Sequence, residues 1–184
     1  ATETITGAEA LMRFTMDSEE GPEVISPIEF IPLLEETGLI IPAGKFVLKE
    51  AAKMCCAIRQ FIPDFQMNIN VSYPQIAGGN VEEDLIEVIK EYALNPENLC
   101  IEMTESRLID MSIPFIRFRR KLEERRIGFA IDDFGTGYSN LHCISDINPD
   151  YIKIDRDFTA KAMNGQRDYK LLKNIIAMIH SVNA

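Results

Sequence analysis

Strand-like and helix-like patterns alternate along this chain of 184 residues. Short apolar runs are followed by segments whose apolar residues recur three and four positions apart, which is the spacing of one helix face. Strands that alternate with helices form parallel sheets, so the alternation favours an α/β fold. The predicted strands are Ala8–Phe14, Met67–Val71, Leu99–Met103, Gly128–Asp132 and Tyr151–Ile154.

The segments between these strands carry helix signals. After an acidic loop through Gly21, the run Ser26-Pro27-Ile28-Glu29 has the pattern of a capping box with proline at the first helical position. The helix that it opens should stop near Gly38, and Asn80 can cap a later helix. Further helices are predicted from about Ser112 to Arg126, near Leu141–Ile144, and along two apolar stripes: Val47, Ala51, Met54 and Ile58 in one, and Leu171, Leu172, Ile175, Ile176 and Ile179 in the other.

Alternate residues of the predicted strands differ in polarity. One face is apolar and carries Ile69/Val71, Ile101/Met103, Phe129/Ile131 and Ile152/Ile154. The opposite face becomes polar toward the strand ends and carries Asn68/Asn70, Cys100/Glu102, Ala130/Asp132 and Lys153/Asp155. Because ionised groups that leave water need partners, these polar ends indicate a site at the carboxyl ends of the strands. Ligands also bind beyond the strand ends of open sheets, but a polar face on every strand favours a barrel interior.

Composition excludes several classes of function. A formal net charge of −10 disfavours non-specific nucleic-acid binding, which depends on lysines and arginines that meet phosphates. The four cysteines form no C-x-x-C pair and only two histidines are present, so neither a zinc knuckle nor a histidine-rich zinc site is expected. Carboxylate and amide oxygens favour Mg²⁺ or Mn²⁺ instead. The basic residues of the helix predicted at 112–126 are interpreted as a solvated face: Arg117, Arg119, Arg120, Lys121, Arg125 and Arg126.

No apolar run approaches the roughly 20 residues that a membrane-spanning helix needs, and no signal peptide opens the chain. We therefore expect no membrane contact by this segment and a cytoplasmic location.

Six motifs occur in a fixed order along the chain. They are Glu9-Ala10-Leu11-x-Arg13, Phe30-Ile31-Pro32-x-x-Glu35-Glu36-Thr37-Gly38-Leu39-Ile40, Asn70-Val71-Ser72, Glu102-Met103-Thr104-Glu105-Ser106, Asp132-Asp133-Phe134-Gly135-Thr136-Gly137-Tyr138-Ser139 and Lys153-Ile154-Asp155. Together they resemble the EAL-domain family of cyclic di-GMP phosphodiesterases over nearly the whole chain.

The resemblance implies an α/β fold, a TIM-like (β/α)8 barrel of EAL type. Residues 1–184 would be a partial EAL domain with about five strands. By resemblance, the strand that opens the barrel precedes residue 1 and the closing strands follow residue 184, together with a catalytic glutamate in an Ala-Glu-Gly-Val-Glu motif. We therefore expect residues 1–184 alone to be poorly active or unfolded, because unpaired sheet edges and apolar faces would be exposed.

The resemblance also assigns roles to single residues. Glu9, Asn70, Glu102 and Asp132 would hold one metal ion, Asp133 would help hold a second, and Asp155 would lie beside the metals. Lys153 would orient or polarise the attacking water, and Glu105 would anchor the glycine loop that follows Asp133. Leu11 and Arg13 would contact the substrate, with the forked donors of Arg13 on a phosphate. Adjacent Asp132 and Asp133 can face the same mouth only if the chain leaves strand geometry between them.

The function implied is two-metal hydrolysis of cyclic di-GMP to linear pGpG with two Mg²⁺ or Mn²⁺ ions, in bacterial second-messenger signalling. A homodimer and fusion to sensory or GGDEF domains are further expectations from the family. Two alternatives stay open: a catalytically inactive EAL domain that acts as a cyclic di-GMP receptor, and a scaffold that only binds proteins. The scaffold leaves the polar strand ends without an explanation.

Overall fold

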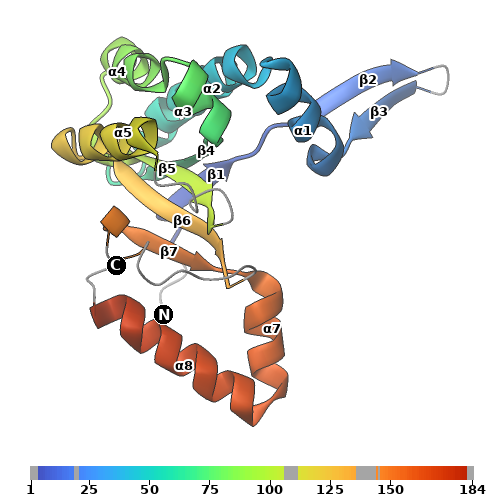
Figure 1. The fold of residues 1–184 in the computed structure, drawn as a ribbon. Helices are drawn as coiled ribbons and strands as arrows, with labels where there is room; N and C mark the ends of the chain where they lie inside the picture. Colours follow the sequence, from blue (N-terminus) through green and yellow to red (C-terminus); the bar gives the residue numbers. More distant parts are fainter. Residues whose placement is uncertain (1–3, 19–20, 106–111, 136–143, 145, 182–184) are drawn as a thin grey trace. The chain divides into compact units, whose positions relative to one another are not determined.

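The computed structural model describes residues 4–18, 21–105, 112–135, 144 and 146–181, drawn in colour in Figure 1. The chain divides into two compact units, Ala1–Leu99 and Cys100–Ala184. The short helix predicted near Leu141–Ile144 and the glycine loop Thr136–Ser139 lie largely or wholly outside the described residues. No helix in the described part of the chain is long and apolar enough to cross a membrane.

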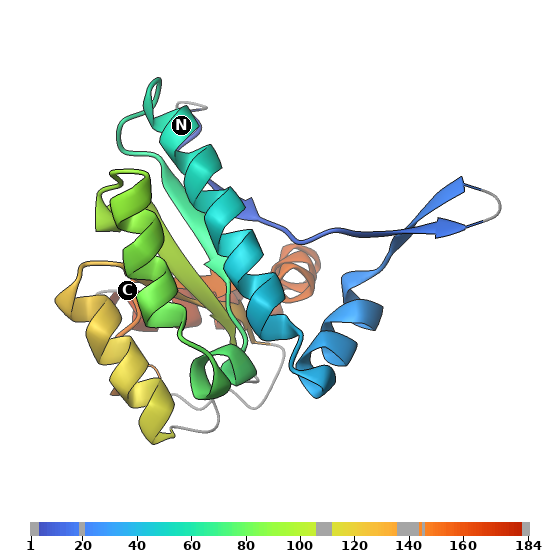
Figure 2. The same cartoon turned by 90° about the horizontal axis from the view of Figure 1, so that it is seen from above.

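The first unit contains a pair of parallel strands with helices. Strand β1 pairs with β4 so that Glu9 lies opposite Asn68. Helix α2 runs along β4 in Figure 2 and packs against it and against α4. The elements of this pair and its helices are β1 (Gly7–Ala10), β4 (Gln66–Asn70), α1 (Pro27–Thr37), α2 (Ile40–Arg59), α3 (Tyr73–Gly78), α4 (Val81–Glu91) and a 3₁₀ turn at Pro96–Asn98.

The stripe predicted along helix α2 is confirmed at Ala51, but the buried face of the helix is centred about one residue further along the chain. Met54, a member of the predicted stripe, is 56% exposed. Two of the buried positions are alanines, Ala51 and Ala52, whose small side chains let neighbouring elements approach closely. Gly44, earlier in the helix, allows a close approach in the same way. A Cβ at Gly44 would lie 1.9 Å from Nε2 of Gln75 on α3. The side chains of α2 that are buried are Ile40, Leu48, Ala51, Ala52 and Cys55.

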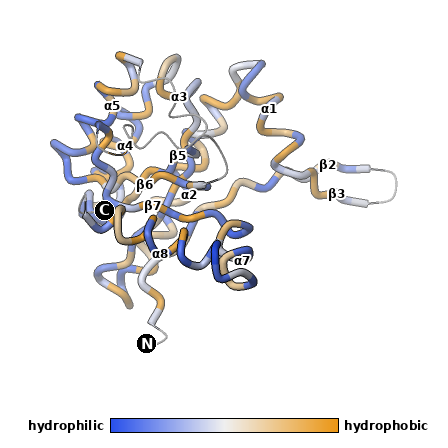
Figure 3. Tube along the Cα trace, turned by 60° about the horizontal axis from the view of Figure 1, so that its bottom comes forward, coloured by the Kyte–Doolittle hydropathy of each residue, from blue (hydrophilic) through white to orange (hydrophobic). Residues whose placement is uncertain are grey.

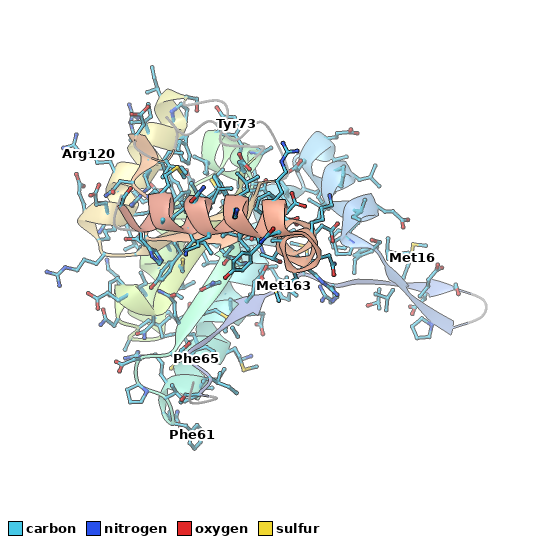
Figure 4. All side chains as sticks on the ribbon, turned by 90° about the horizontal axis from the view of Figure 1, so that it is seen from below. Met16, Phe61, Phe65, Tyr73, Arg120 and Met163 are labelled. Atoms are coloured by element: carbon cyan, nitrogen blue, oxygen red, sulfur yellow. The ribbon has the colours of Figure 1, made fainter. Side chains whose placement is uncertain are left out.

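The prediction of one strand over Ala8–Phe14 followed by an acidic loop is wrong. Strand β1 ends at Ala10, and an antiparallel hairpin follows, formed by β2 (Phe14–Ser18) and β3 (Gly21–Ile25). Its side chains are largely exposed, and Met16, labelled in Figure 4, is 51% exposed. A strand without a buried face has no strong alternation of polar and apolar residues, which is why the pattern missed it.

Two of the predicted caps form no side-chain bond. Ser26 and Asn80 occupy the N-cap positions of α1 and α4, but neither side chain makes a capping hydrogen bond. A capping-box bond occurs instead at helix α3, which the sequence pattern did not predict. There the backbone N–H of the N-cap residue, Ser72, donates to Oε1 of Gln75 at 2.9 Å. The predicted stop of α1 is confirmed, because Gly38 adopts the left-handed conformation with φ of 73°.

The second unit contains three parallel strands. The middle strand, β6 (Gly128–Phe134), pairs with β5 (Leu99–Thr104) on one side and with β7 (Tyr151–Ile154) on the other. Both faces of β5 and most of β6 are buried, as is usual for parallel sheets. The predicted apolar pairs Ile101/Met103 and Phe129/Ile131 are no more than 1% exposed. The elements are β5 (Leu99–Thr104), β6 (Gly128–Phe134), β7 (Tyr151–Ile154), α5 (Ile113–Glu124), α7 (Arg156–Asn164) and α8 (Gln166–Ser181).

Helices α7 and α8 pack against each other. The sequence pattern predicted α8 and missed the short helix α7. Hydrophilic and hydrophobic residues are mixed along α8 (Figure 3), and Ile179 of the predicted stripe is buried whereas Leu171 is 49% exposed.

The prediction that the basic residues of α5 form one solvated face is wrong for Arg119. This residue is only 6% exposed. Its Nε donates to the carbonyl oxygen of Ile147 at 3.0 Å, and its guanidinium lies 5.4 Å from the centroid of the Phe129 ring. Arg120, labelled in Figure 4, is exposed as predicted. The helical spacing contained the signal, because Arg119 falls four residues after Phe115 and three before Leu122, both buried.

Candidate metal and phosphodiester site

The first unit brings together two of the predicted metal ligands. Glu9 lies in β1 and Asn70 is the last residue of β4, and the parallel register sets them on neighbouring strands. Nδ2 of Asn70 donates to Oε1 of Glu9 at 2.7 Å. The Asn70 amide donates this bond through its nitrogen. Its oxygen, Oδ1, is a hard ligand atom of the kind that divalent cations prefer.

The two predicted substrate residues follow β1 directly. Leu11 is 55% exposed, and Arg13 is exposed as well. Nη1 of Arg13 donates to the carbonyl oxygen of Met12 at 2.9 Å. Both side chains therefore stand on the surface of the first unit, next to the strand that carries Glu9.

The second unit places two carboxylates and one ammonium group together. Glu102 and Asp132 stand on the paired strands β5 and β6, and their carboxylate oxygens lie within 4.8 Å of each other. Nζ of Lys153 on β7 lies 2.9 Å from Oε2 of Glu102 and 3.4 Å from Oδ1 of Asp132. Register explains the arrangement, because Ile152, which precedes Lys153, pairs with Ile131, which precedes Asp132.

The charge balance of this group is unusual for a strand interior. Glu102 is completely buried and Asp132 is half-buried, and the ammonium of Lys153 lies close to both carboxylates. The burial of neighbouring carboxylates is costly unless positively charged groups lie close to them. The Lys153 ammonium supplies positive charge beside both carboxylates.

Strand β6 does not end at Asp132, as the sequence pattern predicted, but continues to Phe134 through a bulge. One extra residue stands in β6 where its register with β7 shifts between Ile131 and Phe134. Asp133 sits in the bulge with a φ of 54°, which is rare for a residue other than glycine. The chain therefore departs from regular strand geometry at the two adjacent aspartates, Asp132 and Asp133.

Glu105 contacts the start of the glycine loop. It follows the last residue of β5, and its Oε2 accepts a hydrogen bond from the backbone N–H of Gly135 at 2.8 Å. Gly135 has a φ of 101°, a conformation that favours glycine. This carboxylate therefore ties the end of β5 to the residue that follows β6.

Asp155 is the N-cap of helix α7. Its Oδ1 accepts from the backbone N–H of Phe158 at 3.0 Å, and its own N–H donates to the carbonyl oxygen of Phe134 at 3.1 Å. A carboxylate at a helix N-terminus also interacts favourably with the helix dipole. The capping role is by itself a sufficient reason for an aspartate at this position, with no metal ion needed. The capping bond is made by one carboxylate oxygen, Oδ1.

Sequence reasoning missed one neighbour of this site. The ring of Phe158 on α7 lies near Gly135, where an added Cβ would be at an ordinary contact distance of 3.5 Å from Cγ of the ring. The signal was present in the spacing, because Phe158 stands three residues after Asp155, at the N3 position of a capped helix.

Comparison with known proteins gives several matches. The chain is 37% identical over 161 residues to the probable cyclic di-GMP phosphodiesterase PdeI of Escherichia coli K12, covering 86% of this chain and 20% of that protein. It is 31% identical over 183 residues to the bifunctional diguanylate cyclase/cyclic di-GMP phosphodiesterase MucR of Pseudomonas aeruginosa, covering 96% of this chain and 26% of that protein. The chain thus spans a minor part of each of these relatives.

The solved structure of the PaMucR phosphodiesterase in complex with c-di-GMP is similar over 97% of this chain and 71% of that one, with 31% identity and a TM-score of 0.84. This likeness confirms the predicted fold class, an incomplete TIM-like barrel of α/β type with parallel strands. The EAL domain family model matches residues 1–184, the whole of the sequence. The chain therefore belongs to the EAL domain family.

Proposed function

We propose that this chain forms part of a cyclic di-GMP phosphodiesterase that depends on Mg²⁺ or Mn²⁺ and releases linear pGpG. The observation that carries the proposal is the Lys153 ammonium beside the carboxylates of Glu102 and Asp132, at the ends of parallel strands in an EAL domain. The similarity to PdeI and MucR, which are named as cyclic di-GMP phosphodiesterases, supports this choice of substrate. Hydrolysis of a phosphodiester needs positive charge near the phosphoryl oxygens and a positioned water; cations held by the carboxylates would supply the charge, and Lys153 would position the water.

The proposed ligand set consists of oxygen donors. Glu9, Asn70, Glu102 and Asp132 would hold one ion, and Asp133 would help hold a second, with Asp155 beside it. Three carboxylates and one neutral amide match the preference of Mg²⁺ and Mn²⁺, and the amide limits the negative charge that faces an anionic substrate. When bound, a pair of such ions supplies electrostatic stabilisation of the phosphoryl group and a more acidic water.

Lys153 has a separate role in this proposal. In the described structure its ammonium neutralises part of the charge of Glu102 and Asp132. With those carboxylates neutralised by cations, Lys153 can donate a hydrogen bond to the attacking water and orient it toward the phosphorus. The side chain is 36% exposed, which gives the ammonium access to a nucleotide at the strand ends.

Glu105 and Arg13 complete the proposed site. Glu105 acts on the chemistry indirectly, by holding the N–H of Gly135 and thereby the end of β6 that carries the aspartates. The exposed guanidinium of Arg13 offers paired donors to a phosphate of the substrate, and Leu11 offers an apolar surface beside it.

Removal of divalent cations from the complete protein is expected to abolish hydrolysis of cyclic di-GMP. Addition of Mn²⁺ or Mg²⁺ should restore formation of pGpG, while Ca²⁺, which prefers more ligands at longer distances, should restore it poorly. Chromatography of the nucleotides after incubation with chelator, and then with each metal, measures this. Activity that persists after chelation would contradict the proposal, and binding without turnover in either metal would identify a receptor instead.

A further inference from the structure

The residue that precedes strand β7, Asp150, is bound to strand β6 by two hydrogen bonds. The backbone N–H of Asp150 donates to the carbonyl oxygen of Phe129 at 2.9 Å. In return, the backbone N–H of Phe129 donates to Oδ2 of the Asp150 carboxylate at 2.9 Å. Both backbone groups of one β6 residue are thus paired with Asp150, and the carboxylate extends the hydrogen bonding of β6 beyond the first residue of β7.

These two bonds lie just before the residues that place Lys153. The strand pairing that follows sets Ile152 opposite Ile131. Lys153 comes next, and its Nζ lies 2.9 Å from Oε2 of Glu102 and 3.4 Å from Oδ1 of Asp132. Because successive side chains of a strand face opposite ways, a shift of β7 by one residue would turn Lys153 away from both carboxylates.

Strand β7 has few bonds of its own that define this register. It is four residues long and pairs with one other strand in the described sheet. Its pairing with β6 becomes irregular between Ile131 and Phe134, which is the stretch beside Lys153. The two bonds of Asp150 therefore make a large part of the regular attachment of β7 on the amino side of Lys153.

The turn before Asp150 is held by the buried guanidinium of Arg119. Its Nε donates to the carbonyl oxygen of Ile147 at 3.0 Å, and its Nη2 donates to that of Asn148. Asn148 has a φ of 49°, a left-handed conformation that asparagine adopts more readily than most residues. Nη2 also lies 3.7 Å from Oδ2 of Asp150, the oxygen that accepts from Phe129. The positive charge of Arg119 thus stands beside the carboxylate that binds β6.

We propose that Asp150 is a positioning residue for Lys153: its bonds to Phe129 fix the register of β7 and thereby hold the Lys153 ammonium beside Glu102 and Asp132. The inference rests on the proposed function, in which Lys153 orients the attacking water. Asp150 touches no reacting atom, because its carboxylate is bound to the backbone of β6. It acts through the strand that joins it to Lys153.

Removal of the carboxylate should loosen the start of β7. In Asp150→Ala the N–H of Phe129 loses its acceptor, and the short strand can fray from β6. A misplacement of about 1 Å caused far from the chemistry can cost about 100-fold in rate. Because β7 keeps its backbone bonds, we expect a smaller loss in kcat, about tenfold. KM should stay within about twofold of wild type, since Asp150 has no assigned contact with the nucleotide.

The experiment compares Asp150→Ala, Asp150→Ser, Asp150→Asn and Asp146→Ala in the complete protein. Asparagine keeps an oxygen that can accept from Phe129, whereas the serine hydroxyl reaches less far. Asp146 is exposed and lies in the same segment before β7, so its replacement is the matched control.

Three properties are measured for each variant: exchange of the Phe129 amide hydrogen, acetylation of the Lys153 amine by acetic anhydride without nucleotide, and kcat and KM for cyclic di-GMP. Exchange and acetylation should rise and kcat should fall in Asp150→Ala, and less so in Asp150→Ser. Asp150→Asn and Asp146→Ala should stay close to wild type in all three.

A double-mutant cycle with Lys153→Ala separates positioning from a general loss of stability. If Asp150 acts through Lys153, Asp150→Ala should lower kcat by less than about twofold when residue 153 is already alanine. Losses that multiply in the double variant would contradict the inference.

A merely structural role would give another result. The inference is wrong if Asp150→Ala melts at a lower temperature and exchanges Phe129 faster, yet keeps Lys153 acetylation and kcat at the values of Asp146→Ala. If Asp150→Ala does not fold, Asp150→Ser decides by the same criterion, and unchanged Phe129 exchange in that variant also counts against the inference. Exchange and acetylation need no turnover, so they test Asp150 even if the complete protein proves not to hydrolyse cyclic di-GMP, a result that would overturn the proposed function alone.

Discussion

Replacement of Glu102 by glutamine is expected to lower kcat/KM for cyclic di-GMP by at least about 10³-fold, because a metal ligand supplies several kcal/mol of transition-state stabilisation and each 1.4 kcal/mol is about tenfold. Glu102 is fully buried, and its Oε2 lies 2.9 Å from Nζ of Lys153. Glutamine keeps the size of the side chain and an oxygen that can accept from Lys153. It removes the negative charge, so the variant should fold and lose its affinity for the cation.

Steady-state kinetics at saturating Mn²⁺ and circular dichroism of the complete protein measure both parts of this expectation. Glu123→Gln, at an exposed position on α5, is the matched control and should retain wild-type activity. A Glu102→Gln protein that hydrolyses cyclic di-GMP within threefold of the control would show that Glu102 does not hold a catalytic cation.

Replacement of Arg119 by leucine is expected to lower the free energy of unfolding by about 3 kcal/mol, since a hydrogen bond from a charged donor contributes about 1.5–3 kcal/mol and part of that gain is offset by the desolvation of the guanidinium. Arg119 donates to the carbonyl oxygens of Ile147 and Asn148, and its Nη2 lies 3.7 Å from the carboxylate of Asp150. Leucine would leave these carbonyls without their donors and would remove the cation beside the Phe129 ring.

Arg120→Leu provides the comparison at the next position of the same helix. Arg120 is exposed and pairs with Glu124 at 3.0 Å, and an exposed pair four residues apart contributes only about 0.3–0.5 kcal/mol. Urea unfolding of the two variants should therefore give clearly different midpoints. Equal midpoints for Arg119→Leu and Arg120→Leu would mean that the buried guanidinium adds nothing to stability.

The strand and helix pattern predicted most of the regular structure because burial imposes periodicity. Strands such as Leu99–Thr104 are buried on both faces, and helix α4 buries Leu85 and Val88 on one side, so each leaves a clear mark on the sequence. The hairpin β2–β3 leaves none, since its residues are largely exposed. Short helices such as α7 were missed because nine residues show barely two turns of a pattern.

Arg119 shows a limit of reading residues by type. A basic residue among five others on one helix was assigned to solvent, although its position relative to Phe115 and Leu122 placed it on the buried side. Position on the helix was the better guide, because backbone carbonyls and an aromatic ring can receive a guanidinium in a protein interior.

For the site, sequence supplied the identities of the residues and not their geometry. Motif resemblance named Glu102, Asp132 and Lys153, but only the strand register brings Lys153 between the two carboxylates. An irregularity near Asp133 could be predicted, since adjacent residues on a regular strand face opposite ways. The continuation of strand β6 to Phe134 could not. In that continuation Phe134 pairs with Ile154 of β7 and accepts a hydrogen bond from the N–H of Asp155, twenty-one residues later in the chain.

The central claim is that acidic and amide oxygens from separate strands hold the same divalent cation. A crystal structure of the complete protein with Mn²⁺ and cyclic di-GMP, with the metal located by its anomalous scattering, tests this most directly. We expect one Mn²⁺ peak at coordinating distance from Glu9, Asn70, Glu102 and Asp132, and a second beside Asp133. Density in which these four side chains share no metal, while Lys153 stays bound to Glu102 and Asp132, would contradict it.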